Sequence, residues 1–115
     1  METENKEKVE KEFLVRRDEA RDLSFKGKLM ASSSTQRSNN ARWNEFHLYE
    51  TAAGKIVFAI EEHSLYTDEE DCYYAKIYEN LASFVKETEE RERISYSVLK
   101  ELAMQLDIDI SEHID

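Results

Sequence analysis

The side chains of this sequence that could bind a metal ion or take part in catalysis are three histidines, a single cysteine and 26 carboxylates. His47, His63, His113 and Cys72 lack the close paired spacing that zinc sites show. Glu61 and His63 stand two residues apart, so on a strand they share one face and could begin a metal site. Nothing else in the sequence pattern completes that site. We therefore expect no metal ion and no other cofactor.

The residue pattern gives little support to nucleophilic or acid–base catalysis. Cys72 is surrounded by acidic residues, which disfavour a reactive thiolate. Gly27 and Gly54, the only glycines, are too far apart to form a phosphate-binding loop. We therefore predict a protein without catalytic activity. A small enzyme with a pocket between sheet and helix stays open as an alternative, and it would need perturbed carboxylates in that pocket, or His47 or His63 facing into it.

The charge is strongly negative and unevenly distributed. The 115 residues include 16 basic and 26 acidic side chains, for a formal net charge of −10. Residues 1–57 hold 11 basic and 10 acidic side chains, whereas residues 58–115 hold 5 and 16. This balance disfavours direct binding to nucleic acid or to an anionic membrane. No apolar run approaches the roughly 20 residues of a membrane span, so we expect a cytoplasmic protein.

Acidic and tyrosine side chains between positions 61 and 73 indicate a surface for a protein partner. Exposed tyrosine supplies contact area at low entropic cost, and carboxylates favour a basic partner. A basic and aromatic group at positions 37–43 could neutralise and stack on a nucleic-acid strand, but the net charge favours a polar strand connection. The residues assigned to partner contact are Glu61, Glu62, Tyr66, Asp68, Glu69, Glu70, Asp71 and Tyr73, together with Arg37, Arg42 and Trp43.

These residues need a scaffold, and its clearest element is a β-hairpin. Residues 43–51 and 56–64 are rich in aromatic and β-branched side chains, which favour strands. Residues 52–55 between them are typical of a turn, in which Gly54 can adopt a positive φ.

Residues 23–31 alternate apolar and polar side chains, as a half-buried strand does. Gly27 interrupts the apolar face, which indicates a bulge or a place where another segment crosses closely. If this strand lies unpaired at the outside of the sheet, it can pair with a second copy of the chain, so a homodimer stays open.

Helical periodicity begins after position 66. Thr67 followed by Glu70 is a capping-box pattern for a helix N-terminus. The apolar residues that follow keep spacings of three and four, which predicts a helix from about Asp68 to about Glu90. A second helix is indicated by the stripe Val98, Leu99, Leu102, Ala103 and Leu106.

Strands followed by helices are typical of an α+β fold. We predict an antiparallel β-meander of three to four strands packed against two C-terminal helices. Residues 1–12 are a mixed run of Glu and Lys with little apolar surface to bury, which predicts a flexible charged N-terminal tail. Residues 13–115 are expected to form a single domain.

The leading functional hypothesis is a small acidic, non-catalytic accessory protein that acts through protein–protein binding. It rests on the weak catalytic pattern and on the uneven charge. The alternative is an acidic mimic of nucleic acid, which would occupy the basic groove of a DNA- or RNA-binding protein, as inhibitors of phage or plasmid type do. Such a mimic predicts a complex whose affinity falls steeply as the ionic strength rises.

Overall fold

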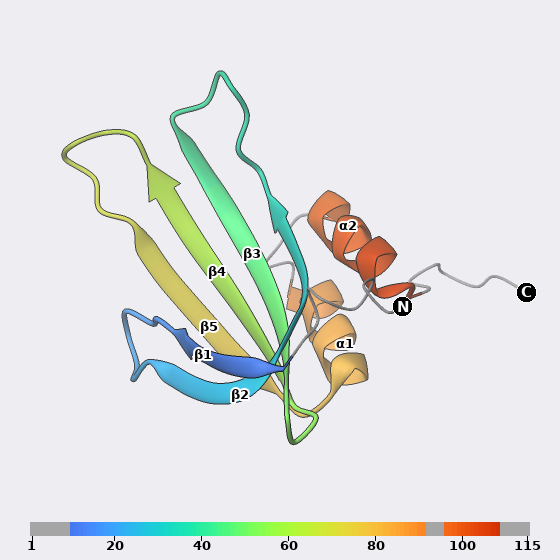
Figure 1. Cartoon of the computed structure of the whole chain (residues 1–115). Helices are drawn as coiled ribbons and strands as arrows, with labels where there is room; N and C mark the ends of the chain where they lie inside the picture. The colour runs from blue at the N-terminus through green and yellow to red at the C-terminus, as the bar shows by residue number, and fades with distance from the viewer. Residues whose placement is uncertain (1–9, 92–95, 109–115) are drawn as a thin grey trace, which may run out of the picture.

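The computed structural model describes residues 10–91 and 96–108. All strand pairs are antiparallel, and each strand lies beside the next one in the chain, so the sheet is a five-stranded meander (Figure 1). Two helices follow it, which makes the fold α+β as expected. The elements are β1 (Lys11–Val15), β2 (Leu23–Ser34), β3 (Arg42–Thr51), β4 (Ile56–Ser64), β5 (Cys72–Tyr78), α1 (Leu81–Arg91) and α2 (Tyr96–Leu106).

The β3–β4 hairpin confirms the sequence prediction. In its turn, the Thr51 amide donates to the Lys55 carbonyl at 2.8 Å, and the Gly54 amide donates to the Thr51 carbonyl at 2.9 Å. Gly54 has a φ of 90°, a conformation that glycine adopts without steric cost. This turn fixes the register of the two strands, which pairs Glu45 with Glu61.

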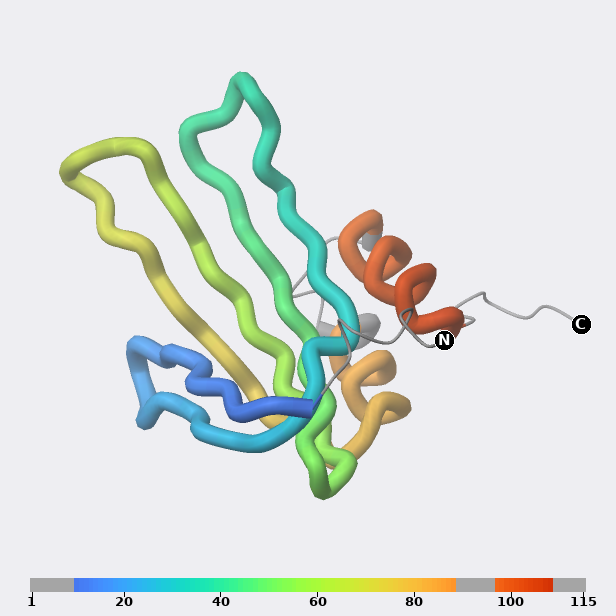
Figure 2. The backbone as a smooth tube through the Cα atoms, in the orientation of Figure 1, coloured from blue at the N-terminus to red at the C-terminus, as the bar shows by residue number. Residues whose placement is uncertain are grey.

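β2 is bent, so its two halves pair with different neighbours. Residues 23–27 pair with β1 and residues 27–34 pair with β3, and the register shifts between Leu29 and Ala31. A Cβ atom on Gly27 would lie 2.2 Å from the carbonyl oxygen of Glu50. Gly27 therefore marks a close crossing, as its place in the sequence indicated. The bend curls the sheet into a half-barrel (Figure 2).

The curl brings the β1–β2 connection, residues 16–22, back to β5. The Asp18 amide donates to the Tyr73 carbonyl at 2.9 Å, and the Tyr73 amide donates to Asp18 Oδ2 at 2.9 Å. The Arg16 guanidinium lies over the Tyr73 ring, 4.4 Å from its centroid. These contacts join the first hairpin to the last strand, and the sheet consequently has a concave side, which we call the inner face.

Both helices pack on the opposite, outer face of the sheet (Figure 1). Phe84 of α1 contacts Phe58 and Tyr78, with ring centroids 4.9 and 5.5 Å apart. The Gln105 side chain of α2 bonds both backbone groups of Ser32 in β2, at 3.0 and 2.7 Å. The main core consists of Ala31, Phe46, Leu48, Ile56, Phe58, Tyr78, Phe84, Val98, Leu99 and Leu102.

The helix predicted from about residue 68 to about residue 90 is wrong in its first part. Residues 72–78 form β5, which pairs along β4, and α1 begins at Leu81. The four-residue spacing of Tyr74 and Tyr78 fits both a helix and a strand. The strand forms because the backbone N–H and C=O groups along the edge of β4 need hydrogen-bond partners, and residues 72–78 supply them. The helix cap is Asn80, whose Oδ1 accepts from the Ser83 amide at 2.9 Å, and not Thr67. The sheet therefore has five strands instead of three or four.

Three further expectations meet the structure only partly. In the sheet order β2 lies between β1 and β3, but residues 23–26 pair only with β1 and residues 28–34 only with β3, and the homodimer stays a prediction. Most of the predicted N-terminal tail lies outside the described residues, and β1 begins at Lys11. Among the described residues, no helix is long and apolar enough to cross a membrane.

Candidate functional site

The inner face carries a row of polar side chains on each of two neighbouring strands, because residues two apart along a strand share one face. Phe46 and Leu48 of β3 point into the core under the helices, so their neighbours in the chain point to the inner face. The same alternation holds for Phe58 in β4. The inner-face residues of these two strands are Trp43, Glu45, His47 and Tyr49 of β3, and Val57, Ala59, Glu61 and His63 of β4.

The apolar end of the inner face is closed by aromatic rings. Phe13 of β1 and Phe25 of β2 lie 4.8 and 5.4 Å from the ring centroid of Tyr49. Val57 and Ala59 are buried beneath this end of the sheet's curl. Burial, followed by the charge of Glu61, raises the pKa of Tyr49 above its ordinary value.

At the other end, two carboxylates face each other across the β3–β4 ladder. Glu45 and Glu61 are paired residues, and like charges in this position destabilise a sheet unless they are compensated. Histidines flank them on both sides. His47 Nε2 lies 3.8 Å from Glu45 Oε1 and 3.6 Å from Glu61 Oε2. His63 Nε2 lies 2.9 Å from Glu61 Oε1 and 3.9 Å from Glu45 Oε1.

The position of the His63 ring is fixed by stacking on one residue and by hydrogen bonds at both of its nitrogens. Its ring stacks on Trp43 with centroids 5.3 Å apart, and its two nitrogens contact Asp71 at 2.8 Å and Glu61 at 2.9 Å. Partial burial opposes protonation of this ring, but the hydrogen bonds to Asp71 and Glu61 prevail and raise the pKa of His63 above its ordinary value. In turn, the hydrogen bond from His63 lowers the pKa of Asp71. Both ring nitrogens can donate at once only in the imidazolium form.

A second polar group lies in the connection between β4 and β5, which we call the β4–β5 tip (residues 65–70). Arg42 makes a two-pronged ion pair with Glu69, at 2.9 Å from Nε to Oε1 and 2.5 Å between the second pair of atoms. The Glu69 carboxylate also accepts from Ser64 Oγ at 2.5 Å. The bonds from Arg42 and then Ser64 lower the pKa of Glu69 to about 2.

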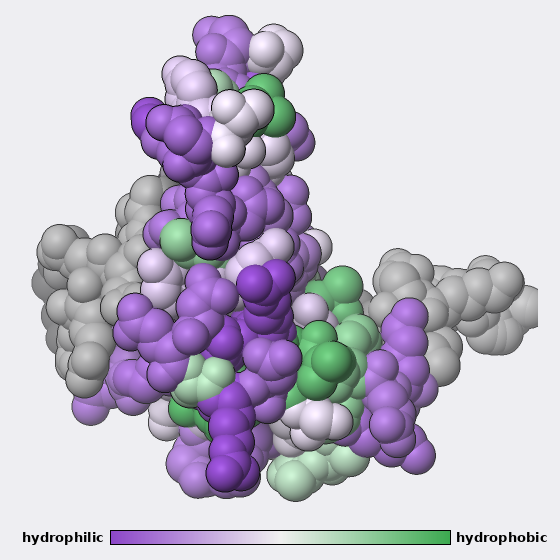
Figure 3. Space-filling model, turned by 90° about the vertical axis from the view of Figure 1, so that its left-hand side faces the viewer, coloured by the Kyte–Doolittle hydropathy of each residue, from purple (hydrophilic) through white to green (hydrophobic). Residues whose placement is uncertain are grey.

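The β4–β5 tip also exposes apolar surface. Leu65 and Tyr66 are 68% and 49% exposed, and the Arg42 guanidinium lies 4.8 Å from the centroid of the Tyr66 ring. Exposed carboxylates surround them at Glu62 and Asp68, and Glu70 adds a third. Figure 3 shows that most of the neighbouring surface is hydrophilic.

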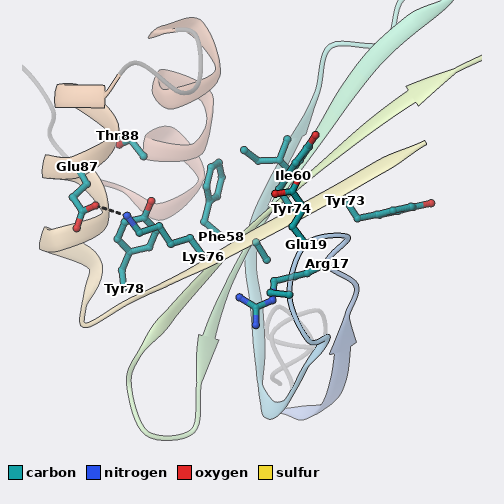
Figure 4. Close-up of a pocket in the computed structure, with 12 residues that line it drawn as sticks. Arg17, Glu19, Phe58, Ile60, Tyr73, Tyr74, Lys76, Tyr78, Glu87 and Thr88 are labelled. Atoms are coloured by element: carbon teal, nitrogen blue, oxygen red, sulfur yellow. Dashed lines mark hydrogen bonds and ion pairs between the residues drawn. The ribbon is translucent and has the colours of Figure 1, made fainter. Parts of the chain in front are cut away.

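A pocket of about 320 Å³ lies on the other side of β5, between the β1–β2 connection and α1 (Figure 4). Tyr74 and Tyr78 line it together with Phe58 of the core. The ammonium of Lys76 in its wall is paired with Glu87 of α1 at 2.8 Å. The pocket-lining residues include Glu19 and Glu87 but neither His47 nor His63, and the enzyme alternative stays a prediction.

The structure separates the residues that the sequence assigned to partner contact. Glu61, Asp71, Tyr73 and Trp43 contribute to the inner face or its rim. Tyr66, Asp68, Glu69 and Glu70 belong to the β4–β5 tip, and Arg42 of β3 and the exposed Glu62 of β4 lie beside it. Arg37 lies apart from both groups, in the β2–β3 connection, where its amide donates to Asn40 at 2.8 Å.

Sequence reasoning named His47 as a candidate ligand but did not place it beside Glu61, and it missed Glu45; these two residues complete the cluster that Glu61 and His63 begin. A turn over residues 52–55 would pair Thr51 with Ile56 and place Glu45 opposite Glu62. The structure closes the turn one residue earlier, between Thr51 and Lys55, and this register places Glu45 opposite Glu61.

Comparisons of the chain with protein-family models, with curated proteins and with solved structures returned no match. The functional argument therefore rests on the side chains described above.

Proposed function

We propose that this protein is a non-catalytic binding module that docks a basic protein partner at the β4–β5 tip. The observation that carries this proposal is the pair of adjacent apolar side chains, Leu65 and Tyr66, which stay exposed at the end of a projecting hairpin. Tyrosine is enriched among the residues that dominate binding energy at protein interfaces. The surrounding carboxylates would form the polar rim of such an interface.

The conformation of the tip is organised before any partner arrives. Ser64 Oγ accepts from the Tyr66 amide at 3.0 Å and donates to Glu69. Glu69 is in turn held by Arg42 of the neighbouring strand. A loop fixed in this way loses less conformational entropy on binding than a loose one, so more of its contact energy appears as affinity.

The charge of the tip selects the class of partner. Glu62, Asp68 and Glu70 are exposed, and Arg42, the cation that contacts the tip, is already paired with Glu69. A partner with Lys or Arg side chains around an apolar patch would match both features, because complementary charges speed association and reject acidic competitors.

The test is a capture experiment with three immobilised forms of the full chain. These are the wild type, the double variant Leu65→Ser with Tyr66→Ser, and Met104→Ser as a matched control. Met104 is 80% exposed on α2, away from the tip, so the control also removes exposed apolar surface. Bound proteins from an extract of the source cell are identified by mass spectrometry at low and high salt, after circular dichroism has confirmed that all three forms are folded.

We expect a basic protein to be retained by the wild type and by Met104→Ser, and to be lost from the double variant. Equal retention on all three forms, or none above the blank resin, would overturn the proposal. Retention that disappears at high salt but does not depend on Leu65 and Tyr66 would instead support the nucleic-acid mimic, because charge alone would then drive binding.

A further inference from the structure

The inner face holds the ligand atoms of a metal site in an arrangement that hydrogen bonding does not explain. One side-chain nitrogen of His47 and one oxygen each of Glu45 and Glu61 all lie within 4.8 Å of one another. The separations of 3.6 and 3.8 Å from His47 Nε2 to the two carboxylates are longer than hydrogen bonds. Two atoms bound to one zinc ion at its usual ligand distances lie at most about 4.2 Å apart. The 3.6 and 3.8 Å separations from His47 Nε2 to the two carboxylates therefore suit a shared ion.

The remaining oxygen of each carboxylate is already used by a donor that orients it. The Trp43 indole Nε1 donates to Glu45 Oε2 at 3.1 Å, and His63 Nε2 contacts Glu61 Oε1 at 2.9 Å. Each glutamate consequently presents its other oxygen to His47. Donors that hold ligand carboxylates in this manner are the usual second layer of a metal site. His63 is itself held by Asp71 through its other ring nitrogen.

Charge and burial favour a cation at this position. Glu45 and Glu61 are directly opposed and only about a third exposed, with side-chain exposures of 32% and 30%. Solvent therefore screens their repulsion less than at the open surface. A divalent ion between them would neutralise both carboxylates and satisfy the His47 nitrogen at once.

We propose that Glu45, His47 and Glu61 bind a divalent transition-metal ion of the zinc class, with His63 as the residue that positions Glu61. Imidazole with two carboxylates suits Zn²⁺ and its neighbours in the first transition row, whereas Mg²⁺ and Ca²⁺ prefer oxygen ligands alone. Three protein ligands leave one coordination position to solvent. This inference goes beyond the proposed docking function and does not depend on it.

The test uses the full chain with Cys72→Ser as background, because a free thiol also binds zinc. After dialysis against a chelator and its removal, the protein is titrated with Zn²⁺ by calorimetry and with Co²⁺ by visible absorption. The variants are His47→Ala and Glu61→Gln in the proposed ligand set, and His63→Gln beside it. His113→Ala is the matched histidine control, and Leu65→Ser with Tyr66→Ser tests independence from the tip.

We expect one Zn²⁺ per chain in the background form, in His113→Ala and in the tip variant, and no saturable binding in His47→Ala. Glu61→Gln keeps the shape of the side chain and is expected to bind at least tenfold more weakly. His63→Gln is expected to lose a factor of about 10 to 100, as for other orienting residues. Millimolar Mg²⁺ should not compete.

Two results would overturn the inference. One is the lack of saturable Zn²⁺ binding in a folded background protein. The other is equal affinity in the background protein and in both ligand variants, which would show an adventitious ion bound elsewhere. If the wild-type chain retains no basic partner in the capture experiment but binds zinc, the result counts against the proposed function alone.

Discussion

Asp18 and Tyr73 exchange a pair of hydrogen bonds, although 55 residues separate them in the chain. One of these bonds joins two backbone groups, and the other uses the Asp18 carboxylate as acceptor. Together they tie the β1–β2 connection to β5, and so they hold the curl that makes the inner face concave.

Replacing the Asp18 carboxylate should loosen this closure. Asp18→Ala leaves the Tyr73 amide without its acceptor, and we expect the free energy of unfolding to fall by about 1 kcal/mol. Asp18→Asn keeps an oxygen in the same place and should lose less. Urea denaturation of the wild type and both variants measures the difference. If the alanine variant is no less stable than the asparagine variant, the carboxylate does not hold the curl.

The two glycines allow a matched test of the bend in β2. In Gly27→Ala the new methyl group would lie 2.2 Å from the Glu50 carbonyl oxygen, so the β2–β3 ladder must shift. We expect a loss of about 3 kcal/mol or more. In Gly54→Ala nothing lies within 4 Å of the new atom, and only the positive φ opposes it, at a cost of about 1 kcal/mol. Thermal and urea denaturation should rank the variants in this order, and the reverse order would contradict the close crossing at Gly27.

Stability should depend on pH through His63 and its carboxylate partners. The folded-state pKa of His63 is raised, so its contribution is complete below the unfolded value of about 6.5 and is lost as the pH rises through the folded value. The pKa of Asp71 is lowered, so its contribution is present above the unfolded value of about 3.9 and is lost as the pH falls. With a chelator present, the free energy of unfolding is expected to be greatest between these two values.

His63→Gln separates the two sides of that profile. This variant should remove the decline in stability above about pH 6.5 that we assign to the loss of the imidazolium. Two further carboxylates face the His63 ring: Glu61 of the same strand, β4, and Glu45 of the neighbouring strand, β3. A variant whose stability declines above that pH as steeply as that of the wild type would show that another group titrates there.

The ion pair at the β4–β5 tip should be visible as an unusually acidic carboxyl group. By NMR titration we expect Glu69 to have a pKa of about 2 in the wild type. Arg42→Gln removes the strongest cause of this shift and should move the pKa toward the ordinary value of 4.5. Ser64→Ala removes a weaker cause and should produce a smaller rise. Equal pKa values in all three proteins would mean that the ion pair does not persist in solution.

Local patterns in the sequence were sufficient for the central hairpin. The residues of β3 and β4 favour strands, and Gly54 marks the turn, so both the element type and the register follow from contacts between close neighbours in the chain. The same locality explains why Glu61 and His63 could be placed on one face in advance. The pairing of Glu45 with Glu61 depends on the residue at which the turn closes. A turn over residues 52–55 would place Glu45 opposite Glu62, whereas the hydrogen bond between Thr51 and Lys55 shifts the pairing by one residue.

β5 shows where local patterns stop being sufficient. Tyr74 and Tyr78 fit a helix and a strand equally well, and the choice depends on β4, whose backbone groups need partners along that edge. The curl is also a tertiary effect. Gly27 in the sequence indicates that some segment approaches closely, but only the fold shows that this segment is the backbone at Glu50. Only the folded chain decides that Asp71 meets His63 and that Asp18 meets Tyr73. The sequence by itself thus determined the elements whose stabilising contacts are short-range, and the tertiary structure decided the contacts that join separate elements, because those depend on the path of the whole chain.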